Sequence, residues 1–60
     1  MWIITKHSGA INTEFVTRIK EDSYGTMAYY GNLAYLVSEK HILDELITAL
    51  RQGRLFLEVE

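Results

Sequence analysis

Apolar side chains recur with the period of a strand over most of the chain, and with the period of a helix toward its C-terminal end. Residues 2–5 form a short apolar run typical of a strand, and the Ser-Gly pair at 8–9 favours a turn after it. In residues 15–21 aromatic and β-branched side chains alternate with charged ones, which indicates a half-buried strand. Residues 21–25 are rich in turn formers, so a hairpin is expected to follow.

The strongest local pattern lies in residues 27–37, MAYYGNLAYLV, which contain no charged side chain. Gly31 and Asn32 suit the two central positions of a primed turn, which matches the twist of the flanking strands. A two-residue loop fixes the register as Tyr30–Leu33, Tyr29–Ala34, Ala28–Tyr35 and Met27–Leu36. One face of the hairpin then carries Ala28, Tyr30, Leu33, Tyr35 and Val37, and the other carries Met27, Tyr29, Ala34 and Leu36. Both faces are apolar.

A helix is predicted over residues 39–52. Ser38 offers an N-cap hydroxyl, Arg51 falls in the last turn and Gly53 stands where a C′ glycine belongs. The apolar side chains at helical spacing are Ile42, Leu43, Leu46, Ile47 and Leu50.

After Gly53 the chain alternates again and predicts a final strand. Its apolar side carries Leu55, Leu57 and Val59, and its other side carries Phe56, Glu58 and Glu60. The fold class is therefore α+β. We expect a single domain over residues 1–60, a small antiparallel sheet in the order ββββαβ with one amphipathic helix packed on one face.

One helix of this length covers one face of a sheet, so the second apolar face of the hairpin needs another cover. Each large apolar side chain left exposed forfeits about 1.5–3 kcal/mol, and a 60-residue domain has little stability to lose. A protein partner or a second copy is the simplest cover, and a strongly curled sheet that wraps over itself is the alternative. The predicted interface consists of Met27, Tyr29, Tyr30, Tyr35 and Leu36.

Composition indicates the cellular compartment in which the chain works. The chain has no cysteine, which excludes disulfides and thiolate metal sites and fits a reducing compartment. No basic segment precedes an apolar run at the N-terminus, and no apolar run is long enough to span a bilayer. A cytoplasmic protein without membrane contact is expected.

The formal net charge of −2 disfavours nucleic-acid binding driven by bulk electrostatics. Arg18 and Lys20 could still edge a stacking platform made by Tyr29 or Tyr35, so single-stranded nucleic acid is the alternative partner. Three acidic residues nearby in the sequence reduce the positive potential of Arg18 and Lys20: Glu14, Glu21 and Asp22.

Catalytic patterns are sparse. The chain has no glycine-rich phosphate loop, and Ser8 and Ser38 lack the flanking glycines of a nucleophile elbow. His41, Asp44 and Glu45 could approach one metal ion, but a closed site needs about four ligands. No enzyme activity, metal or other cofactor is expected.

Residues 1–19, MWIITKHSGAINTEFVTRI, resemble the opening of small uncharacterised proteins of Gram-positive bacteria and their phages. Those proteins begin with Met-Trp-Ile, reach an Ile-Asn-Thr corner, and place several strands before a C-terminal amphipathic helix. The likeness covers most of the chain and is specific at residues 1–4 and 11–12. It departs at the tyrosine-rich hairpin and after Gly53.

This resemblance implies an origin in a mobile element, where small proteins often inhibit or regulate another protein by binding it. It supplies no catalytic residues. The function expected from the sequence is a non-catalytic protein-interaction module, such as a phage inhibitor that blocks a host defence complex, working as a homodimer or on a larger partner.

Overall fold

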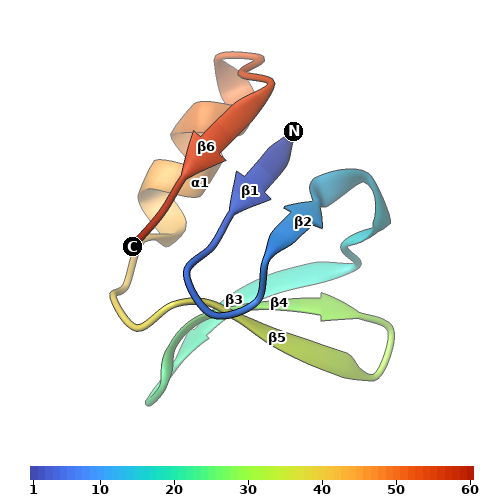
Figure 1. The fold of residues 1–60 in the computed structure, drawn as a ribbon, viewed down its shortest axis with the longest axis vertical. Coiled ribbons are helices and arrows are strands. Elements are labelled where there is room, and N and C mark those ends of the chain that lie inside the picture. Colours follow the sequence, from blue (N-terminus) through green and yellow to red (C-terminus); the bar gives the residue numbers. More distant parts are fainter.

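The computed structural model describes all 60 residues as two three-stranded sheets and one α-helix (Figure 1). The elements are β1 (Trp2–Ile4), β2 (Ala10–Asn12), a 3₁₀ turn η1 (Thr13–Phe15), β3 (Arg18–Asp22), β4 (Gly25–Tyr30), β5 (Leu33–Ser38), α1 (Leu43–Arg51) and β6 (Phe56–Glu58). The predicted α+β class is confirmed. The strands divide between two sheets, however, whereas the sequence indicated a single antiparallel one.

The first sheet has the order β2-β1-β6 and joins the two ends of the chain. Strand β1 runs antiparallel to β2 and parallel to β6, so Ile3 lies between Ile11 and Leu57. All three side chains are buried on the inner face. A parallel pair needs a long crossover, and here the second sheet and α1 occupy the chain between its two strands.

The second sheet has the order β3-β4-β5 and contains the predicted hairpin. The pairs Tyr30–Leu33, Tyr29–Ala34, Ala28–Tyr35 and Met27–Leu36 form as predicted. Gly31 has φ 59°, as a primed turn requires. Beyond Leu36 the register shifts, so that Val37 is an extra residue and both it and Ser38 are buried.

The core is small and is shared by both sheets and the helix. Its buried apolar members are Ile3, Ile11, Ala28, Val37, Leu46, Ala49 and Leu57. Met1, Val16, Ile19, Tyr30, Ile42 and Val59 pack against it while partly exposed. Most large apolar side chains of this chain are therefore half-covered or exposed.

The helix begins four residues later than predicted, at Leu43. Ser38 is no N-cap: its Oγ accepts from the Lys40 N–H at 3.1 Å and donates to the Glu60 carbonyl at 2.8 Å. The buried Thr26 hydroxyl donates to the Lys40 carbonyl at 2.8 Å and accepts from the Ile42 N–H at 2.9 Å. These bonds hold the segment between β5 and α1 extended, and so they delay the helix.

The helix ends as predicted. Gly53 has φ 70°, and its N–H donates to the Leu50 carbonyl at 3.1 Å. The Arg54 N–H donates to the Ala49 carbonyl at 3.2 Å, which completes a Schellman motif.

The predicted apolar stripe of the helix is divided between the core and an open groove beside β3. Leu46 enters the core together with Ala49, a residue that the sequence pattern did not single out. Ile47 and Leu50 stay exposed and line a groove of about 410 Å³ against Val16 and Ile19. A membrane-spanning helix is absent from the structure, since the nine-residue α1 is its only α-helix.

Two further sequence expectations need correction. The strand predicted over 15–21 begins only at Arg18, because the Asn12 side chain accepts from the Glu14 N–H at 3.1 Å and caps the 3₁₀ turn instead. Strand β2 was not predicted. The sequence pattern places Leu55 on the apolar side of the last strand, but it is 74% exposed, because it lies in the link between α1 and β6, before the strand begins at Phe56.

We expect Gly25→Ala to unfold the protein, whereas Gly31→Ala should cost only about 1–2 kcal/mol. Both glycines have positive φ, but a Cβ on Gly25 would lie 2.2 Å from the Ser38 carbonyl oxygen, and a Cβ on Gly31 would meet nothing within 4 Å. Urea denaturation followed by circular dichroism measures both. Equal losses of stability would contradict the close approach of β4 to the end of β5.

Candidate interaction surface

The outer face of the second sheet carries two rows of three side chains, one from each strand. Arg18, Tyr29 and Ala34 form one row, and Lys20, Met27 and Leu36 form the next. We call these six residues the outer face. The antiparallel register places them on one side, because directly paired residues of neighbouring strands point the same way.

Tyr29 lies at the centre of a cationic cluster. The Arg18 guanidinium carbon is 4.6 Å from the centroid of its ring, and the Lys20 ammonium nitrogen is 6.0 Å from the same centroid. Cations at such distances are attracted by the ring quadrupole. The two basic residues that the sequence analysis assigned to a nucleic-acid alternative thus belong to the same surface as the tyrosine.

The outer face is only half-covered. Met27, Tyr29 and Leu36 are partly buried, and Ala34 is exposed. The long side chains of Arg18 and Lys20 lie over Tyr29 and shield part of the ring, as amphipathic side chains commonly do.

The remaining two residues of the predicted interface lie on the other face of the hairpin. The rings of Tyr30 and Tyr35 meet edge to face, with centroids 5.5 Å apart and planes at 68°. The Tyr30 hydroxyl donates to the Asn12 carbonyl at 3.3 Å and so ties the hairpin to the first sheet. Tyr35 is 36% exposed near the free edge of the sheet. The five predicted residues therefore do not form one flat patch.

The inner face of the hairpin is covered by the first sheet as well as by the helix. Ala28 and Val37, on the inner face of the hairpin, are buried in a core that Ile3 and Ile11 of the first sheet share with the helix. The sequence predicts that the helix alone covers one face, and this is wrong, because the first sheet shares that role. No strand or helix of the chain packs across the outer face as an additional layer.

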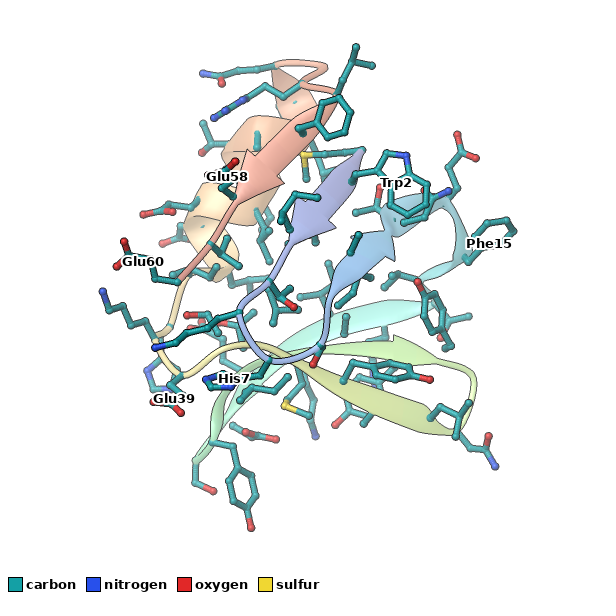
Figure 2. The ribbon with its side chains drawn as sticks, in the orientation of Figure 1. Trp2, His7, Phe15, Glu39, Glu58 and Glu60 are labelled. Atoms are coloured by element: carbon teal, nitrogen blue, oxygen red, sulfur yellow. The ribbon has the colours of Figure 1, made fainter.

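A second exposed aromatic surface was missed by the sequence analysis. Trp2 and Phe56 are directly paired across β1 and β6 on the outer side of the first sheet, and they are 42% and 58% exposed. Trp2 stands out from the strands in Figure 2. No local pattern could have revealed the pair, because its members are 54 residues apart and meet only through the parallel pairing of the chain ends.

The titratable residues considered for chemistry do not gather into a metal site. The His41 ring is 3.0 Å from the Asp22 carbonyl oxygen, ahead of the helix that holds Glu45. His7 is 3.7 Å from Glu39, and both side chains are exposed (Figure 2). No three histidine or carboxylate side chains gather as potential metal ligands.

Comparison with protein-family models, with curated proteins and with solved structures gives no match. The N-terminal resemblance to small proteins of Gram-positive bacteria and their phages accordingly stays a prediction.

We expect a double-mutant cycle of Arg18→Ala and Tyr29→Leu to give a coupling free energy of about 0.5–1 kcal/mol, because the guanidinium is attracted by the ring face. Urea denaturation of the four proteins measures it. The matched cycle of Arg51→Ala with Tyr29→Leu should give no coupling, since Arg51 lies on the helix. Equal coupling in both cycles would contradict the stacked geometry.

Proposed function

We propose that this chain is a non-catalytic protein-binding module whose outer face docks on a larger protein. The observation that carries the proposal is the Arg18 guanidinium stacked on Tyr29, in the row next to the paired Met27 and Leu36. Arginine, aromatic residues and methionine are the residue types enriched in protein interfaces, and tyrosine and arginine are frequent binding hot spots.

The outer face also suggests the chemistry of the partner. Arg18 and Lys20 bring two positive charges to one edge of an apolar centre. A complementary surface is apolar in the middle and carries carboxylates opposite these two side chains. We infer that the partner is an acidic protein surface rather than a purely apolar one.

The resemblance of residues 1–19 gives this proposal a setting. It favours an inhibitor or regulator encoded by a phage or another mobile element, acting on a host protein such as a defence complex. The absence of cysteine is compatible with work in the reducing cytoplasm.

The second candidate function is binding of single-stranded nucleic acid on the same face. It is favoured by one observation, the two cations within reach of a single aromatic ring. The stacked guanidinium, however, already occupies one face of the Tyr29 ring, so a base stacking on that face would have to displace it. The formal net charge of −2 also works against phosphate.

Site-specific crosslinking in a Gram-positive host tests the protein-binding proposal. We expect p-benzoylphenylalanine at Leu36, on the outer face, to yield one dominant protein adduct on irradiation. The same probe at Tyr24, which is 75% exposed in the β3–β4 turn, should not yield it. Arg18→Glu should abolish the adduct by placing a carboxylate against the acidic partner, whereas Arg51→Glu on the helix should leave it intact. Identical adducts from both probe positions would overturn the proposal.

A labelled oligothymidine separates the two candidate functions. We expect no saturable change in its fluorescence anisotropy at moderate salt. If the outer face binds nucleic acid through its two cations, affinity should instead fall about sevenfold between 50 and 200 mM salt, from a slope of roughly −0.7 per neutralised phosphate. Saturable binding with that slope, lost in Tyr29→Ser, would establish the nucleic-acid alternative.

A further inference from the structure

Strand β6 ends the first sheet with a set of unpaired backbone groups. Its ladder to β1 uses the Leu55 carbonyl, which accepts from the Trp2 N–H at 2.8 Å, and the Val59 N–H, which donates to the Ile4 carbonyl at 2.9 Å. In a parallel pair alternate residues bond to the neighbour, so the N–H and C=O groups of Phe56 and Glu58 point away from β1. No other strand lies beside them (Figure 1).

The other outer edges of the two sheets are protected in recognisable ways. Strand β3 is charged along its length, with the sequence RIKED. At β5 the Ser8 hydroxyl donates to the Leu36 carbonyl at 2.8 Å, and at β2 the Tyr30 hydroxyl donates to the Asn12 carbonyl. Charge and coverage are the usual means by which sheet edges avoid pairing with another chain. At the β6 edge the Ser38 hydroxyl donates to the Glu60 carbonyl at 2.8 Å, beyond the end of the strand. The outward backbone groups of Phe56 and Glu58 have no partner, and Leu55 and Phe56 are exposed at the start of this edge.

The two ends of the β6 edge carry opposite charge. Arg54 lies at its start and lines a hollow of about 360 Å³ beside Leu57, under the exposed side of α1. Glu58 and Glu60 lie at its other end (Figure 2), which Glu45 of the helix also adjoins. The exposed Lys40 ammonium nitrogen is 3.9 Å from Glu60, so three carboxylates and one cation leave this end acidic. An antiparallel neighbour of the same sequence would set the basic end of one edge against the acidic end of the other.

We propose that two copies of this chain pair antiparallel through β6, with Leu57 facing Leu57 of the second copy. In this register Phe56 of each copy faces Glu58 of the other, and these are the residues whose backbone groups are free, so four hydrogen bonds form. Leu55 faces Val59 on the inner side, which covers the most exposed leucine of the chain. Arg54 faces Glu60 at both ends of the ladder.

Two features favour the register with Leu57 opposite Leu57: the Schellman motif at the end of the helix and the charge of Glu58. Shifting it by one position, to bring Phe56 opposite itself, would require the Arg54 N–H to join the ladder. That N–H already donates to the Ala49 carbonyl in the Schellman motif. Shifting it the other way would place Glu58 opposite Glu58, and like charges directly opposite one another are destabilising. The Leu57-centred register avoids both problems.

The pairing joins β2-β1-β6 of both copies into one continuous six-stranded sheet. A contact made by a single short strand lies at the small end of the range for specific interfaces, so we expect a weak, concentration-dependent dimer. This inference does not rest on the proposed function, because β6 and the outer face belong to different sheets.

Sedimentation equilibrium at low and high concentration tests the register through charge reversal. Arg54→Glu and Glu60→Arg should each weaken self-association about tenfold or more, because each creates two like-charge pairs in the homodimer. An equimolar mixture of the two variants should recover wild-type affinity, because both pairs in the mixed dimer are again attractive. Within one copy the two residues stand at opposite ends of the strand, roughly 20 Å apart at about 3.3 Å per residue, so rescue cannot come from the monomer.

Two variants complete the experiment. Glu58→Pro removes an N–H that points away from β1, so we expect a folded protein by circular dichroism that no longer self-associates. Glu14→Arg, a charge change of the same kind as Glu60→Arg but in η1, should self-associate like the wild type. A wild-type chain that stays monomeric at high concentration would overturn the proposal, and so would a mixture that associates no more tightly than either variant alone.

Discussion

The parallel pairing of β1 with β6 is the interaction on which the rest of this structure depends. It sets Ile3 beside Leu57 and Ile11, and it closes the chain around a helix that is only nine residues long. A helix of that length is marginal in isolation, so it persists because Leu46 and Ala49 are held in the core. The pairing is non-local, because it joins the two ends of the chain. The ladder can therefore form only after most of the chain is ordered.

Local elements were predictable wherever a turn residue settles the geometry. The hairpin register followed from Gly31 and Asn32, and the end of the helix followed from Gly53. Its beginning did not, because the Ser38 hydroxyl is engaged by Lys40 in the segment that follows it and by Glu60 beyond the end of β6. Strand β2 escaped notice because three residues are too few to show a period, and only β1 beside them makes them a strand.

The division of the hairpin residues between two faces was predictable from the two-residue loop, but the alignment of Arg18 and Lys20 with one of these faces was not. Met27, Tyr29 and Leu36 share a face with Arg18 because the register extends across all three strands. The turn residues at 21–25 predict a hairpin between β3 and β4 but do not fix its register, so the sequence leaves protein-binding and nucleic-acid-binding residues as alternatives. The structure joins them in one cluster around Tyr29. The pair of Trp2 and Phe56 in the first sheet could not be predicted, because it depends on the long-range pairing of β1 with β6.

The two proposed surfaces would reinforce one another. The outer face lies on the second sheet, and the β6 edge lies on the first, so pairing of two copies leaves both outer faces free. A dimer would then present two identical docking faces in a fixed relation. Two linked sites bind a repeated or symmetric partner far more tightly than either site alone, without any new contact. A weak β6 contact and a small docking face can thus act together on an oligomeric target, which offers a 60-residue chain a route to strong binding that its own small surface does not provide.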